Sequence, residues 1–185
     1  MKIAVFSESY KPCISGVARS IETFEKELTL LGHEVFVFAP GYPGYKDNSK
    51  KIIRFPSLPT KYPGFRIALP LPCFILDINF AVIHSNSIFQ LGLLAMYYAK
   101  RKRIPFVYTF HTMFTEYLHN VPVPKNISLP VVSFLIRFFC NRCDQIIVPT
   151  AKTKKYLEGF NVKAPIEVVP SGIDMAFAEK ASSVG

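Results

Sequence analysis

Two histidines in this sequence follow short apolar runs, at the positions where a parallel sheet presents side chains for chemistry. His84 comes directly after Val82 and Ile83, and His111 comes after the run 106–110. The carboxyl ends of strands in an open α/β sheet face one crevice, so both imidazoles are expected there. A neutral imidazole could bind a hydroxyl or phosphate oxygen, or transfer a proton near pH 7. The alternative, for either residue alone, is a buried histidine bonded to the backbone.

Further polar residues stand close to these histidines in the chain. Asn86 lies two residues after His84, and Glu116 and Tyr117 lie in the segment after His111. We expect all three to contact the same crevice, although a solvated loop is the alternative for Glu116 and Tyr117. No metal site is expected, because no third ligand has a helpful spacing.

A long loop, residues 7–16, follows the first apolar run and ends in Ser15-Gly16 at the start of a predicted helix. Backbone N–H groups at such a helix start can bind an anion, and glycine lets a phosphate come close. The loop lacks the G-x-G-x-x-G pattern, and the second apolar run ends in Ala39-Pro40 instead of an acidic residue. Both features argue against a nicotinamide-dependent enzyme.

The elements that would position these residues alternate along the chain. The helical patterns cover residues 17–31, 88–102, 128–143 and 151–160, with Gly32 ending the first and Thr150 capping the last. Seven short apolar runs are the predicted strands: 3–6, 35–39, 52–55, 81–83, 106–108, 146–148 and 166–169. This alternation predicts an α/β, Rossmann-like, three-layer domain with a mostly parallel sheet.

The segment 56–72 is different, because it holds five prolines and Gly64. We do not expect continuous regular structure in it. Arg66 stands among apolar residues in this segment, so it could contact a substrate; the alternative is a linker folded over the surface.

Bulk properties limit the class of protein. The 185 residues are enough for one domain, and 22 Lys and Arg against 13 Asp and Glu give a net charge of +9. This charge suits anionic lipid headgroups or a phosphorylated substrate, although simple solubility would also explain it. A nucleic-acid role is not expected, since the basic residues are scattered and no reader motif is present.

Apolar runs and cysteines indicate where the protein works. No apolar run approaches the ~18 residues that a membrane span needs, and the first residues lead directly into a strand pattern. We therefore expect a cytoplasmic protein. Such a protein could also bind peripherally to the inner face of the membrane. Cys140 and Cys143 have the spacing of a zinc or redox pair, but no second pair accompanies them, which favours two packed thiols.

Several of these segments together resemble family 4 (GT4, group 1) of the retaining glycosyltransferases, which have the GT-B architecture of two facing Rossmann-like domains. The resemblance covers nearly the whole chain, and residues 66–70 and 111–117 look most like glucosyltransferases that act on diacylglycerol. Its carriers are Ser15-Gly16-Val17-Ala18, Leu31-Gly32-His33-Glu34-Val35, the segment 84–92, Thr109-Phe110-His111-Thr112 and Pro170-Ser171-Gly172-Ile173-Asp174.

The resemblance implies roles for particular residues. Ser15 and Gly16 would lie near the diphosphate of a nucleotide-sugar donor, such as a UDP-sugar, and His111 would be the catalytic residue beside the donor sugar. The acceptor, a lipid or another hydroxyl compound, would contact a further set of residues: Arg66, His84, Asn86, Glu116 and Tyr117. The transfer would need no metal or cofactor and would retain the configuration of the sugar carbon.

The resemblance also implies a domain division, and the chain departs from the family in two ways. Residues 1–174 would form the amino-terminal acceptor-side domain, and 175–185 the start of a linker to an absent donor domain. The chain alone is then expected to be inactive, because half of the electrostatic site is missing. Asn86 stands where the family often has a second histidine. The rival hypothesis is a stand-alone module that binds a sugar or phosphate ligand without catalysis.

Overall fold

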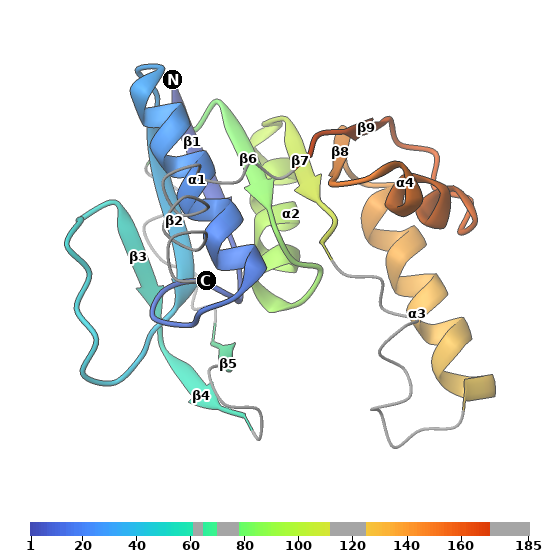
Figure 1. The fold of residues 1–185 in the computed structure, drawn as a ribbon, viewed down its shortest axis with the longest axis horizontal. Coiled ribbons are helices and arrows are strands. Elements are labelled where there is room, and N and C mark those ends of the chain that lie inside the picture. The colour runs from blue at the N-terminus through green and yellow to red at the C-terminus, as the bar shows by residue number, and fades with distance from the viewer. Residues whose placement is uncertain (61–64, 70–77, 112–124, 171–185) are drawn as a thin grey trace, which may run out of the picture.

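A computed structural model gives the arrangement of residues 1–60, 65–69, 78–111 and 125–170, with side chains described from residue 128 onward in the last range. Its main feature is a seven-stranded sheet in the order β3-β2-β1-β6-β7-β8-β9, and every neighbouring pair is parallel (Figure 1). The strands are β1 (Lys2–Phe6), β2 (Glu34–Pro40), β3 (Ile52–Phe55), β6 (Val82–Ser85), β7 (Phe106–Thr109), β8 (Gln145–Val148) and β9 (Ile166–Val168). The seven predicted strands are all confirmed.

In the part of the chain that the structure describes, four helices cover the two faces of this sheet, so the predicted three-layer α/β fold is also confirmed. They are α1 (Gly16–Leu30), α2 (Gln90–Lys102), α3 (Lys125–Cys140) and α4 (Ala151–Glu158). Strand β1 shows why two layers form, because its alternate side chains enter different cores. Val5 packs with α1 residue Ile21, whereas Phe6 packs in the core that α2, α3 and α4 cover. Figure 1 shows α1 in front of the sheet and α2 behind it.

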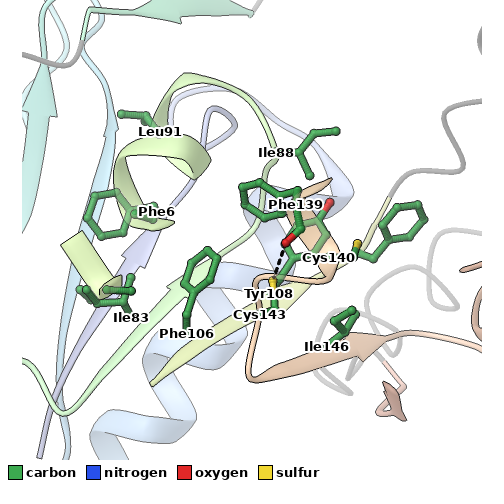
Figure 2. Packing of buried hydrophobic residues seen from close by; sticks show 14 of the residues in the cluster. Phe6, Ile83, Ile88, Leu91, Phe106, Tyr108, Phe139, Cys140, Cys143 and Ile146 are labelled. Carbon is green, nitrogen blue, oxygen red and sulfur yellow. Dashed lines mark hydrogen bonds between the residues drawn. The ribbon is translucent and has the colours of Figure 1, made fainter. Parts of the chain in front are cut away.

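The larger core is rich in aromatic residues, which pack with aliphatic side chains and two cysteines (Figure 2). Tyr108 on β7 packs edge-on against Phe139 on α3 at a centroid distance of 5.0 Å. Cys140 and Cys143 are buried in this core and are not disulfide-bonded, as expected for packed thiols. Burial raises the pKa of Cys140 to about 12, and the Cys143 thiol donates to the carbonyl of Phe139. Both thiols are therefore protonated and unreactive near pH 7.

The proline-rich segment contains more regular structure than the sequence predicted. β4 (Ser57–Pro59) and β5 (Arg66–Ala68) pair antiparallel in a small second sheet. The prolines do not prevent this ladder, because an edge strand of three residues tolerates a missing N–H group. The boundaries of α3 also differ from the prediction, since the helix begins at Lys125 and contains Pro130. The predicted linker, residues 175–185, lies outside the described residues.

Candidate functional site at the carboxyl edge of the sheet

Three neighbouring strands deliver polar side chains to one edge of the sheet. In the register of β1, β6 and β7, Phe6 pairs with Ser85, and Ser85 pairs with Tyr108. The Asn86 N–H group donates to the carbonyl of Phe6 at 2.8 Å, so Asn86 stays in line just beyond β6. The residues that follow these strands therefore lie next to one another, as the sequence predicted.

His84 lies in the interior of this edge. It is only 7% exposed, and its Nε2 is 2.7 Å from the hydroxyl of Thr109 on the next strand. The ring of Phe24 on α1 packs edge-on against the imidazole at 5.9 Å. Burial, and secondarily the nearby His111, lower the pKa of His84 to about 4. His84 is therefore neutral at pH 7, and its described contacts are with protein groups.

His111 lies closer to the surface and is paired with Asn86. Its Nε2 is 2.8 Å from Oδ1 of Asn86, which is itself 7% exposed. Burial lowers the pKa of His111 to about 4, so this imidazole is also neutral at pH 7. The Nδ2 group of Asn86 is buried and has no hydrogen-bond partner among the residues that the structure describes. An unpaired buried donor is costly, and a ligand oxygen could satisfy it.

Ser15 and Gly16 form the first turn of α1, as predicted. The Ser15 hydroxyl accepts from the N–H group of Ala18 at 3.0 Å and lies 2.6 Å from the hydroxyl of Ser9. No hydrogen bond from the N–H groups of Gly16 or Val17 to another described residue is found. A Cβ added to Gly16 would meet no atom of the described residues within 4 Å. This helix start is open, and α1 lies on the face of the sheet that carries His84.

Glu8 is a residue of this edge that the sequence reasoning missed. Its Oε1 accepts from the N–H group of Leu91, in the first turn of α2, at 2.7 Å. Burial raises the pKa of Glu8, although hydrogen bonds, including that from Leu91, oppose the shift. A signal was available in the sequence: α2 starts after Phe89, which has no capping side chain, so an acceptor had to come from elsewhere.

Among the remaining predicted residues, only Arg66 lies in the part of the chain that the structure describes. Arg66 donates to the hydroxyl and the carbonyl of Ser57 at 2.7 and 2.8 Å, and its guanidinium lies over the ring of Tyr42. Glu116 and Tyr117 lie outside the described residues. Within the described ranges no group of three His, Cys, Asp or Glu side chains could hold a metal ion. No described helix is both long enough and apolar enough to cross a bilayer.

The fold and this edge define a Rossmann-like α/β domain whose polar site lies at the carboxyl ends of parallel strands. The profile of Glycosyltransferase Family 4 matches residues 14–177. The chain therefore belongs to this family of glycosyltransferases, and the expectation of an amino-terminal domain related to diacylglycerol glucosyltransferases is confirmed.

Two curated relatives cover nearly the whole chain. It is 35% identical to an alpha-monoglucosyldiacylglycerol synthase of Streptococcus pneumoniae over 97% of this chain and 42% of that protein. It is 32% identical to the protein of the same name from Acholeplasma laidlawii over 95% of this chain and 47% of that protein. The chain thus spans somewhat less than half the length of these relatives.

A likeness to a solved structure supports the fold alone. The structure of the sucrose-phosphate synthase of Thermosynechococcus elongatus superposes with a TM-score of 0.62, over 99% of this chain and 52% of the synthase chain. Its sequence identity to this chain is 15%.

Proposed function

We propose that this domain is the acceptor-side half of a retaining glycosyltransferase that moves a sugar from a UDP-sugar to a lipid such as diacylglycerol. One observation supports the site: the Asn86–His111 pair and the open first turn of α1 belong to the same edge of the sheet. The names of the relatives from Streptococcus pneumoniae and Acholeplasma laidlawii support the lipid acceptor.

The chemistry that we propose uses neutral groups. The Gly16 and Val17 N–H groups, at the positive end of the α1 dipole, would bind the donor diphosphate. The neutral imidazole of His111 would contact the donor sugar beside the reacting carbon. The acceptor hydroxyl would attack the face that the nucleotide leaves, and fixed dipoles would stabilise the charge on the departing phosphate. The reaction would need neither a metal nor another cofactor.

The test is a transfer assay of the complete gene product, with UDP-sugars and other nucleotide sugars against lipid and soluble acceptors. We expect transfer to diacylglycerol, and a loss of at least 100-fold for His111→Ala, the order of one positioned catalytic contact. Asn141→Asp, far from this edge, is the matched control. Binding of a sugar or phosphate ligand without any transfer would instead support the stand-alone module.

We further propose that residues 1–185 alone do not catalyse transfer. The relatives are about twice as long as this chain, and the part of them beyond the match would supply the remaining groups on the donor diphosphate. Turnover by residues 1–185 at a rate similar to that of the complete gene product would contradict this.

We also propose peripheral binding to the cytoplasmic face of the membrane, and the surface of α3 supports the membrane binding. Val131, Phe134 and Leu135 are exposed on one side of this helix, with Phe134 62% exposed. Arg142, just beyond the helix, lies over the ring of Phe138 at 3.7 Å. Apolar side chains beside an arginine suit the membrane–water interface. There the apolar side chains enter the acyl boundary, and the arginine contacts anionic headgroups.

Flotation with vesicles tests this setting. We expect binding to vesicles that contain an anionic phospholipid, weaker binding to neutral vesicles, and a loss of binding for Phe134→Glu. Leu30→Glu, at the exposed end of α1, replaces an apolar residue that is at least as exposed and is the control. Equal binding to neutral and anionic vesicles at low salt would remove the electrostatic part of the proposal.

A further inference from the structure

The contact between Asn86 and His111 places two different kinds of atom together. An amide Oδ1 can only accept a hydrogen bond, so the imidazole nitrogen 2.8 Å away from it must be the donor. In a neutral imidazole one nitrogen carries the proton and the other has a lone pair. The contact is therefore compatible with a proton on Nε2 and a lone pair on Nδ1.

We infer that Asn86 is a positioning residue, which holds His111 in the tautomer that leaves Nδ1 as a hydrogen-bond acceptor for a ligand hydroxyl. This inference rests on the proposed function for the nature of the ligand, but the tautomer itself does not depend on it. A histidine whose second nitrogen is fixed by a partner presents one defined nitrogen to its ligand.

The backbone around the pair is fixed, so the contact is set by the fold. Asn86 is tied to β1 by its N–H bond to the Phe6 carbonyl, and Phe110, next to His111, donates to the carbonyl of Ile147 on β8. Each partner is thus held by a strand other than its own. The other titratable group near His111 is His84, whose pKa His111 lowers in addition to burial, and its Nε2 lies 2.7 Å from the Thr109 hydroxyl.

The second atom of the Asn86 amide is not used by a described residue. Nδ2 of Asn86 is buried and has no hydrogen-bond partner within the described ranges. With Oδ1 on His111, the amide keeps this N–H donor for a ligand oxygen. The pair then offers one donor and one acceptor, and a hydroxyl group is a ligand that can use both.

Nitrogen NMR of residues 1–185 with labelled histidine rings tests the inference without any transfer assay. We expect the His111 signals, assigned with His111→Gln, to show a protonated Nε2 and an unprotonated Nδ1 at pH 7. Asn86→Ala should give a mixture of the two tautomers. Asn86→Asp should keep the Nε2 proton and raise the pKa of His111 by roughly one unit or more, because a carboxylate favours the imidazolium. Asn141→Asp should change neither.

A proton on Nδ1 in the unchanged chain would mean that the amide is reversed, and it would overturn the inference. An unchanged tautomer in Asn86→Ala would also overturn it, since Asn86 would then serve packing only. In the complete gene product, Asn86→Ala should lower kcat about tenfold, the order of one hydrogen bond, with a smaller change in acceptor KM. The expected tautomer in a gene product that transfers no sugar would contradict the proposed function while leaving the role of Asn86 intact.

Discussion

Helices α1 and α2 both begin just beyond the carboxyl end of a strand in the same parallel sheet, yet their first turns have different surroundings. At α1, Ser15 caps the helix from within its own loop, and the space in front of Gly16 is open. At α2, the carboxylate of Glu8 from another loop accepts from Leu91. A Cβ added to Gly92 would lie 2.0 Å from the carbonyl oxygen of Ser87.

The difference shows which of the two helix starts can receive a ligand anion. Both have a positive dipole end and first-turn N–H groups without a partner in their own helical ladder, which is the arrangement that binds phosphate. At α2 the protein supplies its own acceptor, the buried carboxyl group of Glu8, and closes the space with the chain around Ser87. At α1 no described carboxyl group or chain segment does so, and the proposed diphosphate would find this helix start open. The same motif in one sheet thus serves packing at α2 and is free for binding at α1.

The substitution Gly92→Ala tests the closed site and should have the largest effect. The added methyl group overlaps backbone atoms, which cannot move as a side chain can, so we expect a loss of about 3 kcal/mol or more in the free energy of unfolding. Urea denaturation monitored by circular dichroism measures it. Gly16→Ala in the same assay is the control and should cost almost nothing. Equal losses for the two variants would remove the distinction between the helix starts.

Glu8 provides the second test. Glu8→Ala removes the acceptor of the Leu91 N–H group and should cost about 2 kcal/mol, because a buried donor is left unpaired. Glu8→Gln keeps an acceptor without the charge, and it should be at least as stable as the unchanged chain at pH 7. A carboxyl whose folded pKa is raised stabilises most below its unfolded pKa and loses that contribution as pH rises.

The pH dependence separates Glu8 from the buried histidines. His84 and His111 have lowered pKa values, so their contribution is present above about pH 6.5 and is lost as pH falls toward 4. When the free energies of unfolding of the unchanged chain and Glu8→Gln are subtracted, the contribution of the histidines cancels, because both chains contain them. The stability advantage of Glu8→Gln over the unchanged chain should grow as pH rises above about 4.5. A difference that grows in the opposite direction would contradict the burial of the Glu8 carboxyl group as the cause.

These residues also show what the sequence could and could not predict. The strands and the meeting of His84, Asn86 and His111 followed from apolar runs and from the rule that parallel strands end at one edge. Glu8 could not be placed, since its partner Leu91 is 83 residues away and only the folded sheet brings them together. The engagement of Arg66 with Ser57 likewise depends on a hairpin that the prolines concealed.

Ser15→Ala tests the cap at the open helix start and should have a moderate effect. Loss of the bond to the Ala18 N–H group should cost about 1 kcal/mol in the free energy of unfolding. Thr150→Ala is a matched control, because Thr150 caps α4 with the same geometry, accepting from Thr153 at 3.1 Å. Both variants should lose similar stability, but only Ser15→Ala should raise the KM for the donor in the complete gene product. A raised donor KM in both would point to general destabilisation instead.

Gly16→Ala should have the smallest effect on stability and is the most direct test of binding at α1. Alanine is a better helix former than glycine, and its methyl group meets no atom of the described residues, so the folded chain should be as stable as before or slightly more stable. The same methyl group would stand where the donor diphosphate approaches the Gly16 and Val17 N–H groups. We expect the donor KM of the complete gene product to rise about tenfold, the order of one weakened hydrogen bond to an anion, and Gly16→Val to raise it further. An unchanged donor KM in both variants would show that the diphosphate binds elsewhere, because no loss of stability could mask the result.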